Sequence, residues 1–166
     1  AAMTAAETGH LVFSTLHCSD TVGALDRILS MYPPEEQEAV RRQLGMTLKG
    51  VIAQRLLPRK GGEGRVAAVE ILKVNNAVAN LIRTAQFSQI YNVLETSSGQ
   101  GMQGFDTALA KLVYDGLLEE DIASTVTRNK KLFHDKLAML NNPPELDQEE
   151  GNSESNGGFF GRSRRG

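Results

Sequence analysis

The feature that most constrains the fold is a run of six uncharged residues, 11–16, which follows Gly9 and His10 and ends at polar side chains. An apolar run of this length, bounded by Gly before it and by Ser and Asp after it, predicts a strand over residues 10–16 that is buried on both faces. In open α/β sheets, ligands bind at the carboxyl edge of such strands. The polar side chains at or just beyond this edge therefore form the candidate chemical site: Thr15, His17, Cys18, Ser19 and Asp20.

Size and charge bound the class of protein. The 166 residues are 40% hydrophobic, which suits one packed domain, or one domain and a small piece. The net charge of −2 gives no general case for binding nucleic acid or a membrane surface. No apolar stretch approaches the roughly 20 residues that span a bilayer, so no membrane insertion is expected. The single cysteine, Cys18, excludes an internal disulfide and a tetracysteine zinc module, and it fits a reducing compartment.

The start of the chain is helical in character. Residues 1–8 have no capping residue before them and no initiator Met at position 1. We expect them to be the end of a helix closed by Gly9, and the chain to be a fragment. After the predicted strand, Ser19 or Asp20 can cap a helix over about 20–31.

The remaining segments alternate between helix and hairpin patterns. Pro34 is expected to begin a helix whose apolar stripe comprises Val40, Leu44, Leu48, Val51 and Ile52. Gly45 and Gly50 lie inside this stripe and indicate either a break or a close packing contact. Two apolar runs around the Gly-rich residues 59–64 predict a β-hairpin. Further helices are predicted over 77–84 (capped by Asn75 or Asn76), around 87–94 and 105–113, and over 118–127 and 129–140, with disorder from 141 onward.

Two histidines are the natural candidates for chemistry. His10 and His17 are seven residues apart, so a regular strand would place them on opposite faces, away from a common metal. His17, Cys18 and Asp20 lack a second ligand cluster, and no metal site is expected. From the residues alone, His17 is either a hydrogen-bonded structural histidine or a catalytic one.

Other short motifs have simple interpretations. The segment Arg59-Lys60-Gly61-Gly62 lacks the Gly-x-x-x-x-Gly-Lys-Ser/Thr order of a phosphate-binding loop, and no Walker A motif occurs in the sequence. We interpret it as an exposed hairpin turn. The terminal segment 159–165 is either a docking peptide or a solvated end.

The segment Thr8-Gly9-His10-Leu11-Val12-Phe13-Ser14-Thr15-Leu16-His17 resembles the histidine box of the secretion and type IV pilus ATPases. The resemblance continues in order over about residues 1–140. It is carried by Leu25-Asp26-Arg27-Ile28-Leu29, Gly50-Val51-Ile52-Ala53-Gln54-Arg55-Leu56-Leu57-Pro58, Gly64-Arg65-Val66-Ala67-Ala68-Val69-Glu70, Asn80-Leu81-Ile82-Arg83, Gln89-Ile90-Tyr91 and Gly101-Met102-Gln103. The segments Asn80-Leu81-Ile82-Arg83 and Gly101-Met102-Gln103, together with the absence of a tetracysteine module, resemble the PilT-type retraction branch.

The resemblance implies an α/β fold: the C-terminal part of a RecA-like P-loop ATPase core, followed by a helical region. Residues 1–73 would be the back portion of the core, 74–140 the helical C-terminal region, and 141–166 a disordered tail. In this family the Walker A loop, the acidic box and the Walker B strand precede the histidine box. The chain would begin just after Walker B, without the N-terminal PAS-like domain.

The implied function is that of one part of a hexameric, ATP-hydrolysing motor subunit that drives pilus retraction and twitching motility. ATP and Mg²⁺ would be bound mainly by the upstream segment, so the isolated chain is expected to be inactive. Thr15 and His17 would act near the γ-phosphate or the Walker B carboxylate. His10 would be structural or at a subunit contact, and Asn80 and Arg83 would face the pilus machinery or a neighbouring subunit.

The implied partners are the other subunits of a homo-hexamer, the pilus inner-membrane platform protein and paralogous pilus ATPases, in the cytoplasm at the inner-membrane base of the pilus. Two departures from the family pattern matter. His17-Cys18-Ser19 replaces His-Thr-Asn, and the segment Ala77-Val78-Ala79-Asn80-Leu81-Ile82-Arg83-Thr84 lacks an Arg and a Glu of the retraction motif. The small polar residues of the first departure keep the capping role, whereas the second leaves room for an accessory paralogue. The competing hypothesis is a stand-alone, non-catalytic interaction module that docks onto a complete ATPase ring.

Overall fold

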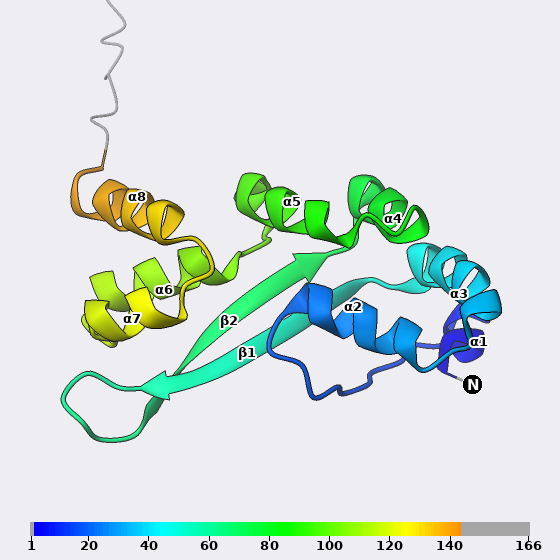
Figure 1. Cartoon of the computed structure of the whole chain (residues 1–166), viewed down its shortest axis with the longest axis horizontal. Helices are drawn as coiled ribbons and strands as arrows, with labels where there is room; N and C mark the ends of the chain where they lie inside the picture. The colour runs from blue at the N-terminus through cyan, green and yellow to red at the C-terminus, as the bar shows by residue number, and fades with distance from the viewer. Residues whose placement is uncertain (1, 144–166) are drawn as a thin grey trace, which may run out of the picture.

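The computed structural model describes residues 2–143, so the predicted tail from residue 144 onward lies outside the described residues. A two-stranded hairpin runs through the molecule, and helices pack along it (Figure 1). The helices are α1 (Ala2–Glu7), α2 (Thr21–Ser30), α3 (Pro34–Thr47), α4 (Asn76–Arg83), α5 (Ile90–Thr96), α6 (Phe105–Tyr114), α7 (Glu120–Val126) and α8 (Lys130–Asn141), with 3₁₀ turns η1 (Phe87–Gln89) and η2 (Ser98–Gln100).

Local capping determines where most helices begin and end. Asp20 accepts a hydrogen bond from Gly23 N at the start of α2, and Asn75 does the same for Val78 N at the start of α4. Pro34 opens α3, where a missing N–H costs nothing. The helix α1 ends at Glu7 and is followed by Gly9, whose φ of 90° is readily adopted only by glycine. These predicted boundaries are confirmed.

The predicted hairpin is also confirmed. Strand β1 (Gly50–Pro58) pairs antiparallel with β2 (Arg65–Lys73), in a register that joins Gly50 to Lys73 and Pro58 to Arg65. The turn is fixed to the helical region because Lys60 N donates to Leu117 O at 2.9 Å. The hairpin turn is therefore held against the loop between α6 and α7.

The prediction that one helical stripe continues through Ile52 is wrong. The helix α3 ends at Thr47, and β1 begins at Gly50. A Cβ on Gly50 would lie 2.9 Å from Leu72 O, so this glycine allows the two strands to approach. Both roles predicted for Gly50, a break in the stripe and a close packing contact, are observed.

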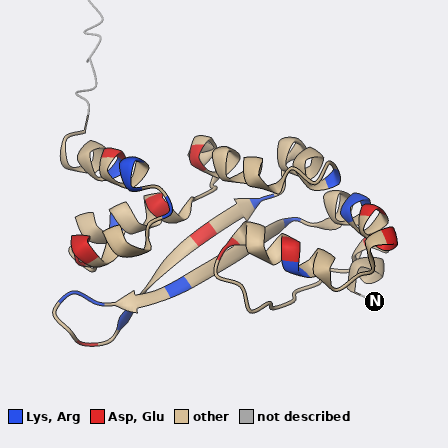
Figure 2. Ribbon diagram, in the orientation of Figure 1, with Lys and Arg blue, Asp and Glu red and all other residues tan. Residues whose placement is uncertain are grey.

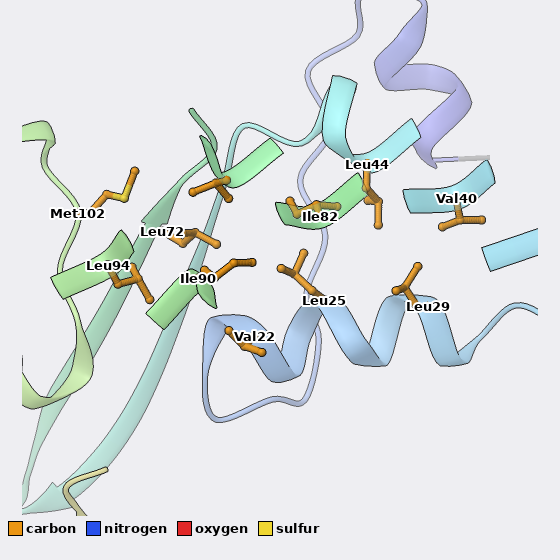
Figure 3. Packing of buried hydrophobic residues seen from close by; sticks show 11 residues of the cluster. Val22, Leu25, Leu29, Val40, Leu44, Leu72, Ile82, Ile90, Leu94 and Met102 are labelled. Carbon is orange, nitrogen blue, oxygen red and sulfur yellow. The ribbon is translucent and has the colours of Figure 1, made fainter. Parts of the chain in front are cut away.

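Two hydrophobic clusters form the core. The first cluster joins α2, α3, α4 and α5 to the end of β2 (Figure 3), through Val22, Leu25, Leu29, Val40, Leu44, Leu72, Val78, Ile82, Ile90, Leu94 and Met102. The second joins the hairpin to α6, α7 and α8, through Leu57, Ala68, Phe105, Leu109, Ala110, Leu118, Ala123, Phe133 and Leu137. Each fully buried Leu, Ile or Phe contributes about 1.5–3 kcal/mol from burial alone.

The predicted buried strand at residues 10–16 is wrong. This segment has no regular structure and connects α1 to α2 along the outside of the described fold (Figure 1). Leu11 is 81% exposed and Phe13 is 88% exposed. A strand needs a neighbour to satisfy its backbone, and neither of the two strands within residues 2–143 pairs with residues 10–16.

The surface carries charges of both signs, spread over the helices and the hairpin turn (Figure 2). Within residues 2–143, no helix is both long and apolar enough to cross a membrane.

Candidate functional site

Thr15 and His17 lie exposed in the irregular segment that leads into α2. Within the described part of the chain, neither side chain forms a hydrogen bond. Cys18, next in sequence, is half-buried, and its Sγ donates to Gly23 O at 3.6 Å. The hydroxyl and the imidazole are thus available to a ligand or to another polypeptide segment.

His10 lies at the other end of this segment and makes only local contacts. Its Nδ1 is 3.0 Å from Thr8 Oγ1 and 3.3 Å from Ala5 O, at the end of α1. No hydrogen bond or ion pair brings His10 together with His17 in residues 2–143, and no group of three His, Cys, Asp or Glu side chains gathers there.

The segment that carries His17 is fixed to the fold three residues later, at Asp20. The carboxylate of Asp20 accepts hydrogen bonds from Gly23 N at 2.8 Å and from the Tyr91 hydroxyl at 3.1 Å. Arg55 on β1 donates from Nε to Ser19 O at 3.1 Å. Contacts from α5 and β1 therefore determine where the segment enters α2.

The next residue, Thr21, is bound to a buried carboxylate. Glu70 on β2 is only 1% exposed, and its Oε1 accepts from Thr21 N at 2.8 Å and from Thr21 Oγ1 at 2.7 Å. Its Oε2 accepts from Arg128 Nη1 at 3.2 Å. Both oxygens of this carboxylate are engaged, as burial of a charge requires.

Arg128 belongs to the loop between α7 and α8 and also contacts Tyr91. Its guanidinium carbon lies 3.9 Å from the centre of the Tyr91 ring, a cation–π arrangement. Burial raises the pKa of Tyr91 to about 12; the nearby Asp20 carboxylate adds to the rise and Arg128 opposes it. We call the five residues Asp20, Thr21, Glu70, Tyr91 and Arg128 the anchor cluster.

A second buried carboxylate holds the loop that presents Arg128. Asp106 on α6 is 3% exposed and accepts three hydrogen bonds: from Thr127 Oγ1 at 2.6 Å, Arg128 N at 2.8 Å and Asn129 N at 2.9 Å. The position of Arg128 is therefore set by α6.

Sequence reasoning assigned no role to Glu70, Tyr91, Asp106 or Arg128. The available signal was a single carboxylate, Glu70, inside the otherwise apolar residues 66–72 of a predicted strand. A charge at such a position is rarely buried without a partner.

Asn80 and Arg83 lie exposed on α4. The stem of Arg83 crosses Gly45 of α3, where a Cβ would come within 2.9 Å of Arg83 Cγ. Arg83 also lines a groove of about 650 Å³ formed largely by α1 and α3. In residues 2–143, no hydrogen bond or ion pair connects this pair to the segment that carries His17.

Comparison with known proteins places this geometry in context. The family model described as "Type II/IV secretion system protein" matches residues 1–120. A twitching motility protein of Neisseria gonorrhoeae is 46% identical over 130 residues, covering 78% of this chain and 35% of the relative. The type IV pilus retraction ATPase PilT of Pseudomonas aeruginosa is 44% identical over 122 residues, covering 74% of this chain and 35% of the relative.

A solved structure of the pilus retraction motor PilT with bound ADP matches with a TM-score of 0.67 and 41% identity, over 78% of this chain and 36% of that one. The chain thus spans about a third of the length of the proteins that it matches. The predicted fold class, α/β and the C-terminal part of a RecA-like ATPase core followed by helices, is confirmed.

Proposed function

Because this chain belongs to the type II/IV secretion system protein family, we propose that it is part of an ATP-hydrolysing motor subunit that drives type IV pilus retraction. The observation that carries this proposal is the identity of 46% and 44% to a twitching motility protein and a retraction ATPase. The family match over residues 1–120 includes the histidine box. The alternative of a stand-alone, non-catalytic module is not favoured, because the matched proteins include a type IV pilus retraction ATPase and the pilus retraction motor PilT.

The sequence of this chain contains no Walker A motif. In the proposed subunit, the phosphate cradle therefore comes from another segment. Mg²⁺ bound with ATP would neutralise charge that develops on the phosphate oxygens. This chain contributes Thr15 and His17, whose exposed hydroxyl and imidazole can hydrogen-bond to a γ-phosphate oxygen or to an upstream carboxylate. The nearby Asp20 carboxylate is already engaged by Gly23 N and Tyr91, so it acts as a support.

The proposed assembly is a homo-hexamer in the cytoplasm, against the inner-membrane platform protein at the pilus base and with paralogous pilus ATPases as further partners. Asn80 and Arg83 are exposed on α4, as a contact with that machinery or with a neighbouring subunit requires. His10 has a structural role at the end of α1 or lies at a subunit contact. In this proposal residues 1–73 complete the core and 74–140 form the helical region.

The experiment is a His17→Ala substitution in the complete subunit. We expect ATP hydrolysis to fall by about 100-fold, the usual cost of removing one hydrogen-bond donor to the reacting group. Assembly, measured by size-exclusion chromatography, should be unchanged because His17 makes no packing contact in the described fold. The matched control is His134→Ala, an exposed histidine on α8 that is 3.5 Å from Glu120.

Wild-type turnover in the His17→Ala subunit would contradict the proposed role of His17. The purified 166-residue chain provides a second measurement: it should show no Mg²⁺-dependent ATP hydrolysis, and measurable activity would contradict the assignment of the phosphate cradle to another segment.

A further inference from the structure

The position of His17 depends on how the chain enters α2. Residues 11–18 have no regular structure, and Thr15 and His17 are exposed. After His17, Arg55 holds Ser19 O, and Asp20 and Thr21 are bound by Tyr91 and Glu70 respectively. Any force that shifts these two residues must move the segment that carries His17, because only two residues intervene.

Glu70 is held in place by a charge from the helical C-terminal region. Arg128 is the one cation that pairs with Glu70 within residues 2–143. Removing one partner of a buried ion pair is strongly unfavourable, because the remaining charge is left uncompensated in a poorly solvated site. Without Arg128, the 1%-exposed Glu70 carboxylate should turn toward water, and this change weakens its two bonds to Thr21.

Arg128 supports the second anchor as well. Its guanidinium packs on the ring of Tyr91, whose hydroxyl donates to Asp20. One side chain thus supports both residues that hold the entry to α2. Arg128 belongs to the loop between α7 and α8, which is hydrogen-bonded to Asp106 of α6. The position of Arg128 therefore depends on the arrangement of α6, α7 and α8.

We propose that Arg128 is a positioning residue that, through Glu70 and Tyr91, couples the arrangement of α6–α8 to the position of His17. This inference rests on the proposed function, in which His17 acts at an ATP site. It deepens that function by making the helical C-terminal region a regulator of the site: a partner that displaces the loop between α7 and α8 would release the His17 segment.

The test uses the complete subunit with Arg128→Met, which keeps the length of the stem and removes the charge. Arg128→Lys, which restores the charge, is the rescue variant. The control is Lys60→Gln, because Lys60 also connects the hairpin to the helical region through an exposed ion pair of 3.4 Å with Glu119, but does not touch the anchor cluster.

The first readout is hydrogen exchange of nucleotide-free protein, in peptides that cover residues 14–25. We expect Arg128→Met to speed exchange at the start of α2 by about tenfold, because the hydrogen bond from Thr21 N to Glu70 is weakened once Glu70 loses its cation. Lys60→Gln should leave these peptides unchanged. Unchanged exchange in Arg128→Met would overturn the coupling.

The second readout is steady-state ATP hydrolysis. We expect kcat to fall by about 10- to 100-fold in Arg128→Met, as for a misplaced catalytic group, with KM for ATP within about twofold because the phosphate cradle is untouched. Arg128→Lys should recover part of kcat. A parallel rise in KM, or wild-type kcat despite faster exchange, would overturn the positioning role.

The two proposals fail separately. If His17→Ala retains wild-type turnover, the proposed role of His17 at the ATP site fails whatever the exchange data show. If His17→Ala abolishes turnover and Arg128→Met changes neither readout, only the coupling fails. Should Arg128→Met not assemble, Tyr91→Phe carries the same test, because it removes one hydroxyl from Asp20 and keeps the ring beneath Arg128.

Discussion

Replacing Asp106 with Asn should destabilise the fold far more than the small change in shape suggests. The carboxylate is 3% exposed and accepts bonds from the hydroxyl of Thr127 and the backbone N–H groups of Arg128 and Asn129. Asparagine offers one acceptor oxygen, and its NH₂ group would face one of these donors. Losing one charge-assisted bond costs about 1.5–3 kcal/mol, and the unpaired buried donor adds about 1 kcal/mol.

The expected loss of about 3 kcal/mol is a large part of a typical stability of about 5–15 kcal/mol. Urea denaturation followed by circular dichroism measures it: the midpoint should fall by about 1–2 M with an unchanged slope. Asp135→Asn, at an exposed position on α8, is the control and should stay within about 0.5 kcal/mol of the wild type. A midpoint for Asp106→Asn equal to that of the control would refute this account of the loop.

Two further substitutions test the packing of the helices. Burial raises the pKa of Glu95 above its ordinary value of 4.5, so folding favours the protonated side chain. The stability that protonated Glu95 contributes is therefore fully present below pH 4.5. It is lost as the pH rises through the raised pKa of the folded state. Glu95→Gln should therefore raise Tm at pH 7 relative to the wild type, with little gain at pH 4; an equal gain at both pH values would contradict the shift. In Gly45→Ala, a gain of about 1 kcal/mol in helix propensity opposes about 1–3 kcal/mol of overpacking, because the new Cβ would lie 3.0 Å from Ala79 O. We expect Tm to fall by about 3 °C, and a rise in Tm would show that α3 and α4 separate easily.

The helix boundaries could be predicted because their causes are local. Asp20, Pro34 and Asn75 act on residues within a few positions, so the sequence around each one contains the whole interaction. The hairpin was predictable for the same reason, since its Gly-rich turn, residues 59–64, lies between two apolar runs. The boundary at Gly50 was not predictable, because the residues before it also fit a helical period, and the close approach of Leu72 O is visible only in the fold.

The anchor cluster could not be predicted because its contacts join distant parts of the chain. Glu70 is 49 residues from Thr21 and 58 from Arg128, and Tyr91 is 71 from Asp20. The strand predicted at residues 10–16 failed for a related reason. Burial of such a run depends on neighbouring strands, and a pattern of apolar residues cannot show whether those strands are present.

Asp20 shows how a local signal and a long-range one meet in a single side chain. Its Oδ1 accepts both from Gly23 N, which begins α2, and from the Tyr91 hydroxyl, which belongs to α5. The start of α2 is therefore a local property, whereas the residues just before it are also held by distant ones, Tyr91 on α5 and Arg55 on β1. If the proposed coupling holds, the position of His17 depends on residues outside its motif, and substitutions near α7 and α8 should alter ATP hydrolysis in the complete subunit.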